Sequence, residues 1–165
     1  MLFRSKFGRM IVKNESELFS TKPLNKLALD ANDPTFTKEA LHIRLKGRKI
    51  PIKEALLNQE IIAGLGNIYV DEVLFASRIS PLREACNVSC TECGKILEES
   101  RKILNKAIEY KGTTIRSYTS SLGVIGEFQN FLCVHTKEIC PICKGEITKT
   151  RISGRGTYYC ARCQK

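Results

Sequence analysis

The fold is decided near the C-terminus by residues 140–163, which read CPICKGEITKTRISGRGTYYCARC. Two Cys-x-x-Cys pairs, Cys140 with Cys143 and Cys160 with Cys163, enclose residues that alternate as short strands. A tight turn within each pair points both sulfurs at one ion, and four thiolates suit tetrahedral zinc. Disulfides or chance spacing are the competing interpretations. We predict a β-hairpin folded around one structural zinc ion, with no coordination position left for catalysis.

Composition favours a nucleic-acid partner. The chain has 165 residues and 8 cysteines, and its 27 Lys and Arg against 17 Asp and Glu give a net charge of +10. Such an excess favours a polyanion, and no segment combines a basic with a bulky apolar face as a membrane-surface helix does. Without a secretory signal or membrane span, we expect a cytoplasmic location, nucleoid-associated in a bacterium, or nuclear or organellar in a eukaryote. We also expect a monomer.

The residues before the hairpin have a helical pattern. Thr37 offers a cap for KEALHIRL, and Pro51 precedes IKEALLN as a first-turn proline does. A third helix begins at Gly66-Asn67, and a longer one is expected from about residue 89 to 110. The predicted fold class is therefore mainly α with a small β zinc hairpin.

Two residues could hold phosphate, but each has an ordinary alternative. Gly154 and Gly156 flank Arg155 and allow a tight turn with the guanidinium at its tip, either forked onto a phosphate or simply solvated. Asn67 stands with free backbone N–H groups at a helix start, where it either binds phosphate or caps its helix. The residues alone leave both alternatives open.

Four further cysteines lie outside the predicted zinc site. Cys86, Cys90 and Cys93 form a C-x3-C-x2-C triplet, the spacing of some iron–sulfur loops. With Cys133 they could instead form a second metal site, or all four could be idle thiols. We favour idle thiols, because no fold for radical chemistry surrounds the triplet.

Three motifs, in this order, resemble the formamidopyrimidine-DNA glycosylase and endonuclease VIII family: IIAGLGNIYVDEVLFASRISPLR, KGTTIRSY and GRGTYYCARCQK. The resemblance covers nearly the whole chain and is closer to the formamidopyrimidine branch. It implies a helix-two-turn-helix domain and a zinc finger that clamp kinked duplex DNA, with the damaged base flipped out during base excision repair. Three parts of the chain are then expected. Residues 1–34 hold a remnant strand of an N-terminal domain and a linker. Residues 35–130 form the helix-two-turn-helix domain, and residues 131–165 form the zinc finger.

The resemblance also implies roles for single residues. Asn67 matches a phosphate-gripping asparagine, and Phe7 matches an aromatic wedge inserted into the base stack. Arg155 matches a finger arginine that contacts phosphates near the lesion and has a proton-donor part in the second elimination step. Arg48 and Lys53 fall near family lysines of the helical region. The DNA-binding residues that the resemblance implies are Asn67, Arg155, Arg48, Lys53, Lys6 and Phe7.

The sequence also departs from the family. The family nucleophile is an N-terminal proline followed by glutamate, whereas this chain opens Met1-Leu2-Phe3. Ser5 stands where an arginine is usual, and VHTKEIC where Val-Tyr-Gly-Arg is common. We therefore expect the DNA-binding part of an oxidised-purine glycosylase and abasic-site lyase, inactive without a separate N-terminal catalytic domain. The alternatives are a non-enzymatic, zinc-dependent nucleic-acid module and a zinc ribbon that binds ribosomes or proteins.

Overall fold

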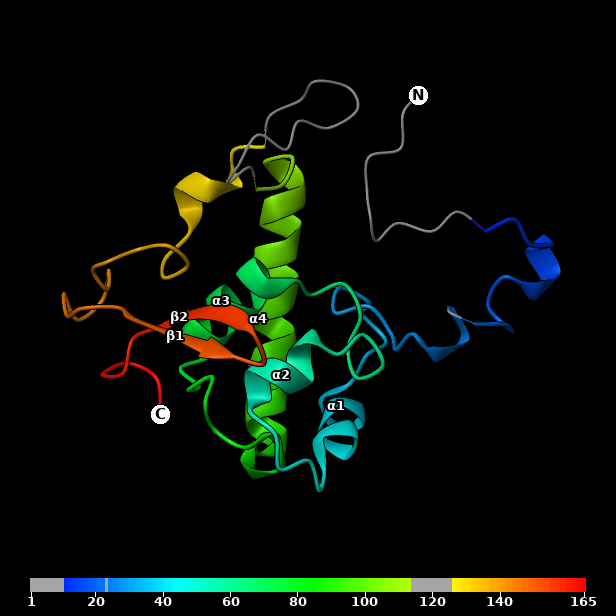
Figure 1. Cartoon of the computed structure of the whole chain (residues 1–165), viewed down its shortest axis with the longest axis horizontal. Coiled ribbons are helices and arrows are strands. Elements are labelled where there is room, and N and C mark those ends of the chain that lie inside the picture. The colour runs from blue at the N-terminus through cyan, green and yellow to red at the C-terminus, as the bar shows by residue number, and fades with distance from the viewer. Residues whose placement is uncertain (1–10, 23, 114–125) are drawn as a thin grey trace.

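A computed structural model describes residues 11–22, 24–113 and 126–165 (Figure 1). Lys6, Phe7 and most of KGTTIRSY lie outside the described residues. The described elements are, in order, the 3-10 turns η1 (Glu15–Glu17) and η2 (Leu24–Lys26), the helices α1 (Lys38–Leu45), α2 (Ile52–Leu57) and α3 (Asn67–Ala76), the turn η3 (Ala85–Asn87), the helix α4 (Cys90–Glu109), the turn η4 (Phe128–Phe131), and the strands β1 (Thr148–Ile152) and β2 (Arg155–Tyr159).

Local signals set the ends of these helices. The Thr37 hydroxyl accepts a hydrogen bond from the Ala40 N–H at 3.2 Å and starts α1 where the sequence predicted. At α4, Ser89 and Glu92 form a reciprocal capping box. Pro51, which lacks an N–H, occupies the position before α2. The mainly helical fold class is confirmed.

The long helix α4 lies at the centre of the described structure (Figure 1). It packs against α1 and α3, and its inward face buries apolar side chains such as Ile96 and Leu97. Removal of apolar surface from water is the main stabilising effect in such a bundle. No helix in the described ranges is long and apolar enough to cross a membrane.

Two turns between α2 and α3 give the helical unit its shape. The Gln59 side chain accepts a hydrogen bond from the Gly64 N–H at 3.0 Å and donates one to the Leu65 carbonyl at 3.1 Å. Gly64 has a φ of +86°, and a Cβ there would lie 2.4 Å from Asp30 Oδ2. Only glycine satisfies both the backbone angle and the close approach. These two turns therefore fix the direction in which α3 begins.

The hairpin differs in one detail from the predicted one. Its strands pair antiparallel, with Ile152 opposite Arg155, so the two-residue loop is Ser153-Gly154. Both loop residues have positive φ, 48° and 76°, as a type I′ turn requires. Arg155 is thus the first residue of β2, one position beyond the tip at which the flanking glycines had placed it.

Candidate metal centre and nucleic-acid interface

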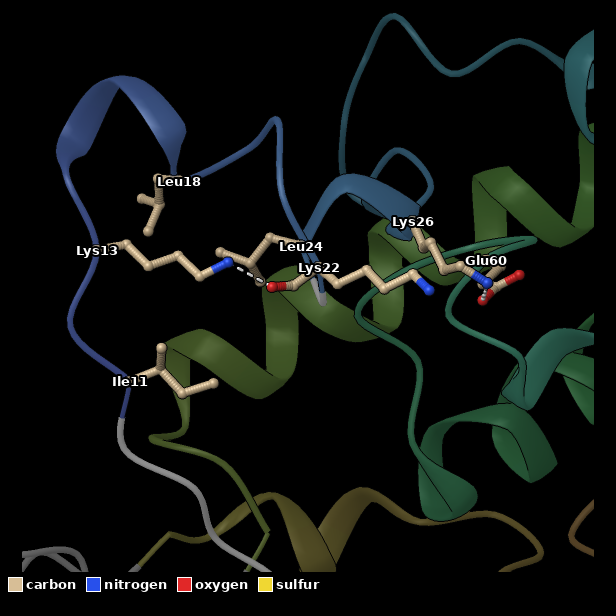
Figure 2. A pocket seen from close by; sticks show the side chains of 7 residues that line it. All are labelled: Ile11, Lys13, Leu18, Lys22, Leu24, Lys26 and Glu60. Carbon is tan, nitrogen blue, oxygen red and sulfur yellow. Dashed lines mark hydrogen bonds and ion pairs between the residues drawn. The ribbon is translucent and has the colours of Figure 1, made fainter.

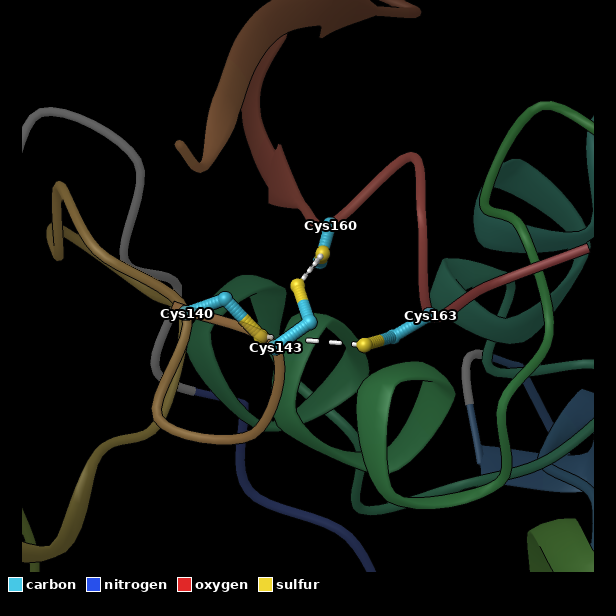
Figure 3. A group of neighbouring side chains, drawn as sticks. All are labelled: Cys140, Cys143, Cys160 and Cys163. Atoms are coloured by element: carbon cyan, nitrogen blue, oxygen red, sulfur yellow. Dashed lines mark hydrogen bonds between the residues drawn. The ribbon is translucent and has the colours of Figure 1, made fainter. Parts of the chain in front are cut away.

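The four C-terminal cysteines converge on one point (Figure 3). Their sulfurs all lie within 4.8 Å of one another, with 3.8 Å between Cys140 and Cys163 and 3.5 Å between Cys143 and Cys160. A tetrahedral zinc ion with sulfur ligands at about 2.3 Å keeps those ligands about 3.8 Å apart. The cluster therefore fits one zinc ion with little rearrangement.

The surroundings of these thiols shift their pKa values in different directions. Burial acts to raise the pKa of Cys140, but the backbone N–H groups of Cys143 and Ile142 bring that pKa down to about 7. Burial and then the neighbouring sulfurs raise the pKa of Cys163 to about 12, and burial raises the pKa of Cys160. Because adjacent thiols oppose one another's ionisation, four thiolates can coexist only around a cation.

A polar junction joins the hairpin to α2 and α3; we define it as Lys53, Asn67, Asp71, His135 and Gly156. The Lys53 ammonium is 0% exposed and donates to Asp71 Oδ1 at 2.7 Å and to the Gly156 carbonyl at 2.9 Å. Asn67 Nδ2 donates to the same carbonyl at 3.1 Å. The second Asp71 oxygen, Oδ2, pairs with His135 Nδ1 at 2.8 Å. One carbonyl of β2 is thus held by two side chains from two helices.

Charge and packing complete the junction. Burial lowers the pKa of Lys53, the hydrogen-bonded Asp71 carboxylate opposes that shift, and the Arg155 guanidinium adds to the lowering. The charge of Arg155 therefore lies close enough to act on Lys53. The Tyr158 N–H donates to Asp71 Oδ2 at 3.2 Å, which places a second point of β2 against α3. A buried ion pair is tolerated when further hydrogen bonds surround it; here the Gly156 carbonyl, His135 and the Tyr158 N–H supply them.

Glu72, the next residue of α3, holds the segment that leads into the finger. Its carboxylate oxygens accept hydrogen bonds from the backbone N–H groups of Cys133 at 2.8 Å, Val134 at 3.0 Å and His135 at 2.8 Å. Burial raises the pKa of Glu72, and these N–H donors act against that shift. Hydrogen bonds to a charged acceptor are stronger than neutral ones, so Glu72 fixes this segment firmly to α3.

The second cysteine pair is fixed to the end of α3. Gln164 Oε1 accepts from the Cys160 N–H at 2.8 Å, and Gln164 Nε2 donates to the Ile79 carbonyl at 2.9 Å. Phe75 of α3 packs in the apolar cluster that contains Cys140 and Cys160. The metal centre and the helices are consequently parts of one continuously packed unit.

Two residues predicted to contact DNA come together in this unit. Arg155 is exposed at the start of β2, and Asn67 is half-buried at the start of α3, hydrogen-bonded to the residue that follows Arg155. Asn67 does not cap its helix, because the N-cap position is Gly66, which has no side chain to make a capping hydrogen bond. The helix start therefore keeps backbone N–H groups for an external acceptor.

Other predicted contacts lie elsewhere. The DNA contact of Lys53 stays a prediction; in the structure its ammonium is buried and donates hydrogen bonds to Asp71 and to the Gly156 carbonyl. Arg48 is exposed on the α1–α2 connector, and its Nε donates to the Arg44 carbonyl at 2.8 Å. Among the described residues, the hydrogen bonds of Arg48 do not join it to the junction.

A surface hollow lies away from the junction, between the N-terminal segment and the two turns (Figure 2). Apolar side chains such as Ile11 and Leu24 line it together with three lysines. Lys13 donates to the Lys22 carbonyl, and Lys26 forms an ion pair with Glu60 at 3.4 Å. Exposed ion pairs of this kind contribute little to stability, and because two of the lysines already have partners, the hollow is a poor candidate for an anion site.

The remaining cysteines do not gather around a common point. Within the described ranges, the only cluster of potential ligands close enough to share an ion is that of the four C-terminal cysteines. Cys93 is buried in α4, where burial and then Cys90 raise its pKa to about 12, whereas Cys133 is exposed. These positions give no support to a second metal site or an iron–sulfur loop.

Sequence reasoning missed the acidic residues that organise the junction. Asp71 and Glu72, which are adjacent in α3, are both nine-tenths or more buried. The sequence pattern of this helix had indicated only an apolar face. Two adjacent acids within NIYVDEVLFA are unusual for a helix otherwise so apolar, and that was the available signal. His135, in the departure VHTK, had no assigned partner until the fold placed it against Asp71.

Comparison with known proteins identifies the helical part. The family model of the formamidopyrimidine-DNA glycosylase H2TH domain matches residues 27–119. This chain belongs to that family. A second model, the zinc finger found in FPG and IleRS, matches residues 137–165, which contain the four-cysteine cluster. The zinc-finger match and the geometry of the four cysteines together confirm the predicted zinc finger.

Curated relatives of this H2TH-family chain are formamidopyrimidine-DNA glycosylases. One from Exiguobacterium sp. is 45% identical over 163 residues, which are 97% of this chain and 59% of the relative. One from Ureaplasma parvum is 43% identical over 160 residues, 96% of this chain and 58% of the relative. The chain therefore spans somewhat less than three-fifths of the length of these relatives.

Solved structures of the H2TH family have the same fold. The Lactococcus lactis Fpg in complex with abasic-site DNA has a TM-score of 0.83 and 35% identity, and the match covers 92% of this chain and 56% of that one. A mutant of the same enzyme with Fapy-dG DNA gives a TM-score of 0.84, 35% identity and the same coverage. Their protein chains extend well beyond the region shared with this one.

Proposed function

We propose that these residues form the damaged-DNA-binding part of a base-excision glycosylase and abasic-site lyase of the oxidised-purine type. The observation that carries the proposal is the hydrogen bond from Asn67 to the carbonyl of Gly156, the residue that follows the exposed Arg155 in β2. One N–H of the Asn67 amide is used by that carbonyl, and within the described part of the chain its second N–H has no hydrogen-bond partner and could donate to a phosphate oxygen. The Arg155 guanidinium, exposed at the start of the same strand, can bind a phosphate in bidentate fashion.

Three further observations support the proposal. The net charge is +10, which favours association with the phosphate backbone. The start of α3, whose N-cap residue is Gly66, has the dipole and N–H groups that attract a phosphate. The Lactococcus lactis relatives were solved with abasic-site and Fapy-dG DNA. The proposed boundaries of the binding unit remain 35–130 for the helices and 131–165 for the finger.

Removing either phosphate contact should weaken DNA binding. We expect Asn67→Ala and Arg155→Ala each to cost about 1–3 kcal/mol of binding free energy on a duplex with an abasic-site analogue, the usual effect of losing one strong contact. Arg155→Ala should also reduce the dependence of log Kd on log salt concentration by about one unit. Fluorescence anisotropy at several salt concentrations measures both quantities.

The matched control is Lys95→Ala, which removes an exposed charge from α4. Its affinity should stay within about twofold of wild type, since an isolated surface charge far from the contact contributes little. Unchanged affinity in both Asn67→Ala and Arg155→Ala would refute the phosphate grip. Equal affinity for intact and abasic duplex would favour the non-enzymatic module, and no duplex binding at moderate salt would favour the zinc ribbon.

Catalysis by a polypeptide of these 165 residues alone is not expected. Its N-terminal sequence, Met1-Leu2-Phe3, lacks the Pro-Glu start whose amine forms the Schiff base in the family. The proton-donor role implied for Arg155 would then be exercised only beside a catalytic domain. Borohydride treatment with abasic DNA should yield no covalent complex, and a trapped complex on denaturing gels would overturn this part of the proposal.

A further inference from the structure

We propose that Lys53 and Asp71 are positioning residues, which place Arg155 beside Asn67 by holding the Gly156 carbonyl and the Tyr158 N–H of β2. The proposal rests on the proposed phosphate grip and gives a role to an ion pair that is buried in the fold. It is carried by the contacts of the junction, which converge on two points of a single strand.

The first step is the geometry of β2. Lys53 Nζ reaches the Gly156 carbonyl at 2.9 Å, and Asp71 Oδ2 accepts the Tyr158 N–H at 3.2 Å. These two points lie on either side of Thr157, which is fully buried. Because groups two residues apart in a strand face the same side, two such hydrogen bonds restrain rotation of the strand about its axis. The direction of the adjacent Arg155 is thereby fixed relative to α3.

The second step is the rigidity of the ion pair. Lys53 and Asp71 are bonded to each other at 2.7 Å, and both side chains are 0% exposed. Asp71 is further fixed by His135, which leads into the finger. A buried Lys–Asp pair costs desolvation energy that a pair of apolar residues would avoid. This cost is explained if the pair fixes an orientation that apolar packing would leave adjustable.

The third step concerns the hairpin tip. Ser153 in the turn donates to the Glu54 carboxylate of α2, next to Lys53 in the sequence. Tip, carbonyl and N–H are therefore all held by consecutive or neighbouring residues of α2 and α3. Pre-ordering of a binding side chain lowers the entropy that DNA binding would otherwise lose. If β2 is less firmly held, DNA binding should weaken, and the whole loss should come from the contact that Arg155 makes.

The decisive variant is Lys53→Met with Asp71→Asn, which removes both charges and leaves no unpaired ion. The asparagine oxygen can still accept from His135 and Tyr158, whereas the Gly156 carbonyl loses Lys53. The matched control is Lys102→Met with Glu98→Gln, which removes an exposed ion pair of α4 at 2.7 Å with the same zero change in net charge. Zinc content and helical circular dichroism establish that each protein is folded.

The readout is a double-mutant cycle with Arg155→Ala on abasic-site duplex. In the wild-type background the Lys53/Asp71 variant should weaken binding about tenfold; in the Arg155→Ala background it should weaken it less than about twofold, because the residue being positioned is gone. Equal losses in both backgrounds would mean a general structural role and would overturn the proposal. The Lys102/Glu98 control should change affinity in neither background.

A second measurement needs no DNA. Amide hydrogen exchange at residues 155–158 should accelerate at least about tenfold in the Lys53/Asp71 variant, while amides near the cysteines keep their protection. Lys53→Met alone should give the same local change if the double variant does not fold. Unchanged exchange would overturn the positioning role even if DNA binds as proposed. Local acceleration without any DNA binding by the wild type would instead count against the phosphate grip alone.

Discussion

Replacing Cys160 with serine should abolish zinc retention and unfold the hairpin, while the helices stay folded. Cys160 is fully buried, and its sulfur lies 3.5 Å from that of Cys143 within the four-sulfur cluster. A structural zinc ion contributes apparent binding energy of about 10–16 kcal/mol, which in a small finger is folding energy. With three ligands left, that contribution falls steeply, because serine is a poor zinc ligand at neutral pH. This is the largest effect that we expect from any single substitution.

The measurements are zinc content by mass spectrometry and amide hydrogen exchange across residues 140–163. Wild-type protein should hold one zinc ion per chain, and Cys160→Ser less than about a tenth of that. Cys133→Ser is the matched control, because Cys133 is exposed and stands outside the cluster; it should keep the full zinc content. Two zinc ions per wild-type chain, or a protected hairpin in Cys160→Ser, would contradict the single structural site.

Replacing Asp71 with alanine should cost about 3–5 kcal/mol in the free energy of unfolding. The substitution leaves the Lys53 ammonium buried, with the Gly156 carbonyl and no counter-charge. It also removes the acceptor used by His135 and by the Tyr158 N–H. A buried charge without a partner is far more destabilising than the loss of the attraction itself. Urea unfolding, followed by circular dichroism at fixed zinc concentration, measures the difference.

Two comparisons test this explanation of the Asp71 effect. Glu98→Ala breaks an exposed ion pair with Lys102 and should cost no more than about 1 kcal/mol. Adding Lys53→Met to Asp71→Ala removes the unpaired charge and should restore part of the lost stability. If Asp71→Ala destabilises no more than Glu98→Ala, the ion pair is accessible to water and the proposed positioning role loses its physical basis.

Local sequence signals were sufficient where the structure depends on neighbours in the chain. Thr37 starts α1 and Ser89 starts α4 through hydrogen bonds to N–H groups three residues away. The cysteine spacing predicted the metal cluster, because each Cys-x-x-Cys pair forms its own turn. The hairpin turn was misplaced by one residue, since Ser153 adopts positive φ at a position that no glycine marks.

The junction could not be predicted, because its partners are distant in sequence. Lys53 in the pattern IKEALL has the appearance of an exposed helical lysine, and only the fold brings it to Asp71 and to the Gly156 carbonyl. The family resemblance had indicated a DNA contact for Lys53. A motif match, however, identifies only the type of residue at a position and says nothing of the side chains that surround it in the fold. Burial of a lysine depends on a counter-charge whose position is set by tertiary packing.

The sequence distances within the junction also imply an order of assembly. Lys53 and Gly156 are 103 residues apart, and Asn67 and Gly156 are 89 apart, whereas the caps of α1 and α4 bridge three residues. Contacts between distant residues form late, because a long loop must close before they gain any energy. Newly made protein would fold its helices first, capture zinc as the finger closes, and acquire an oriented Arg155 only in the last step.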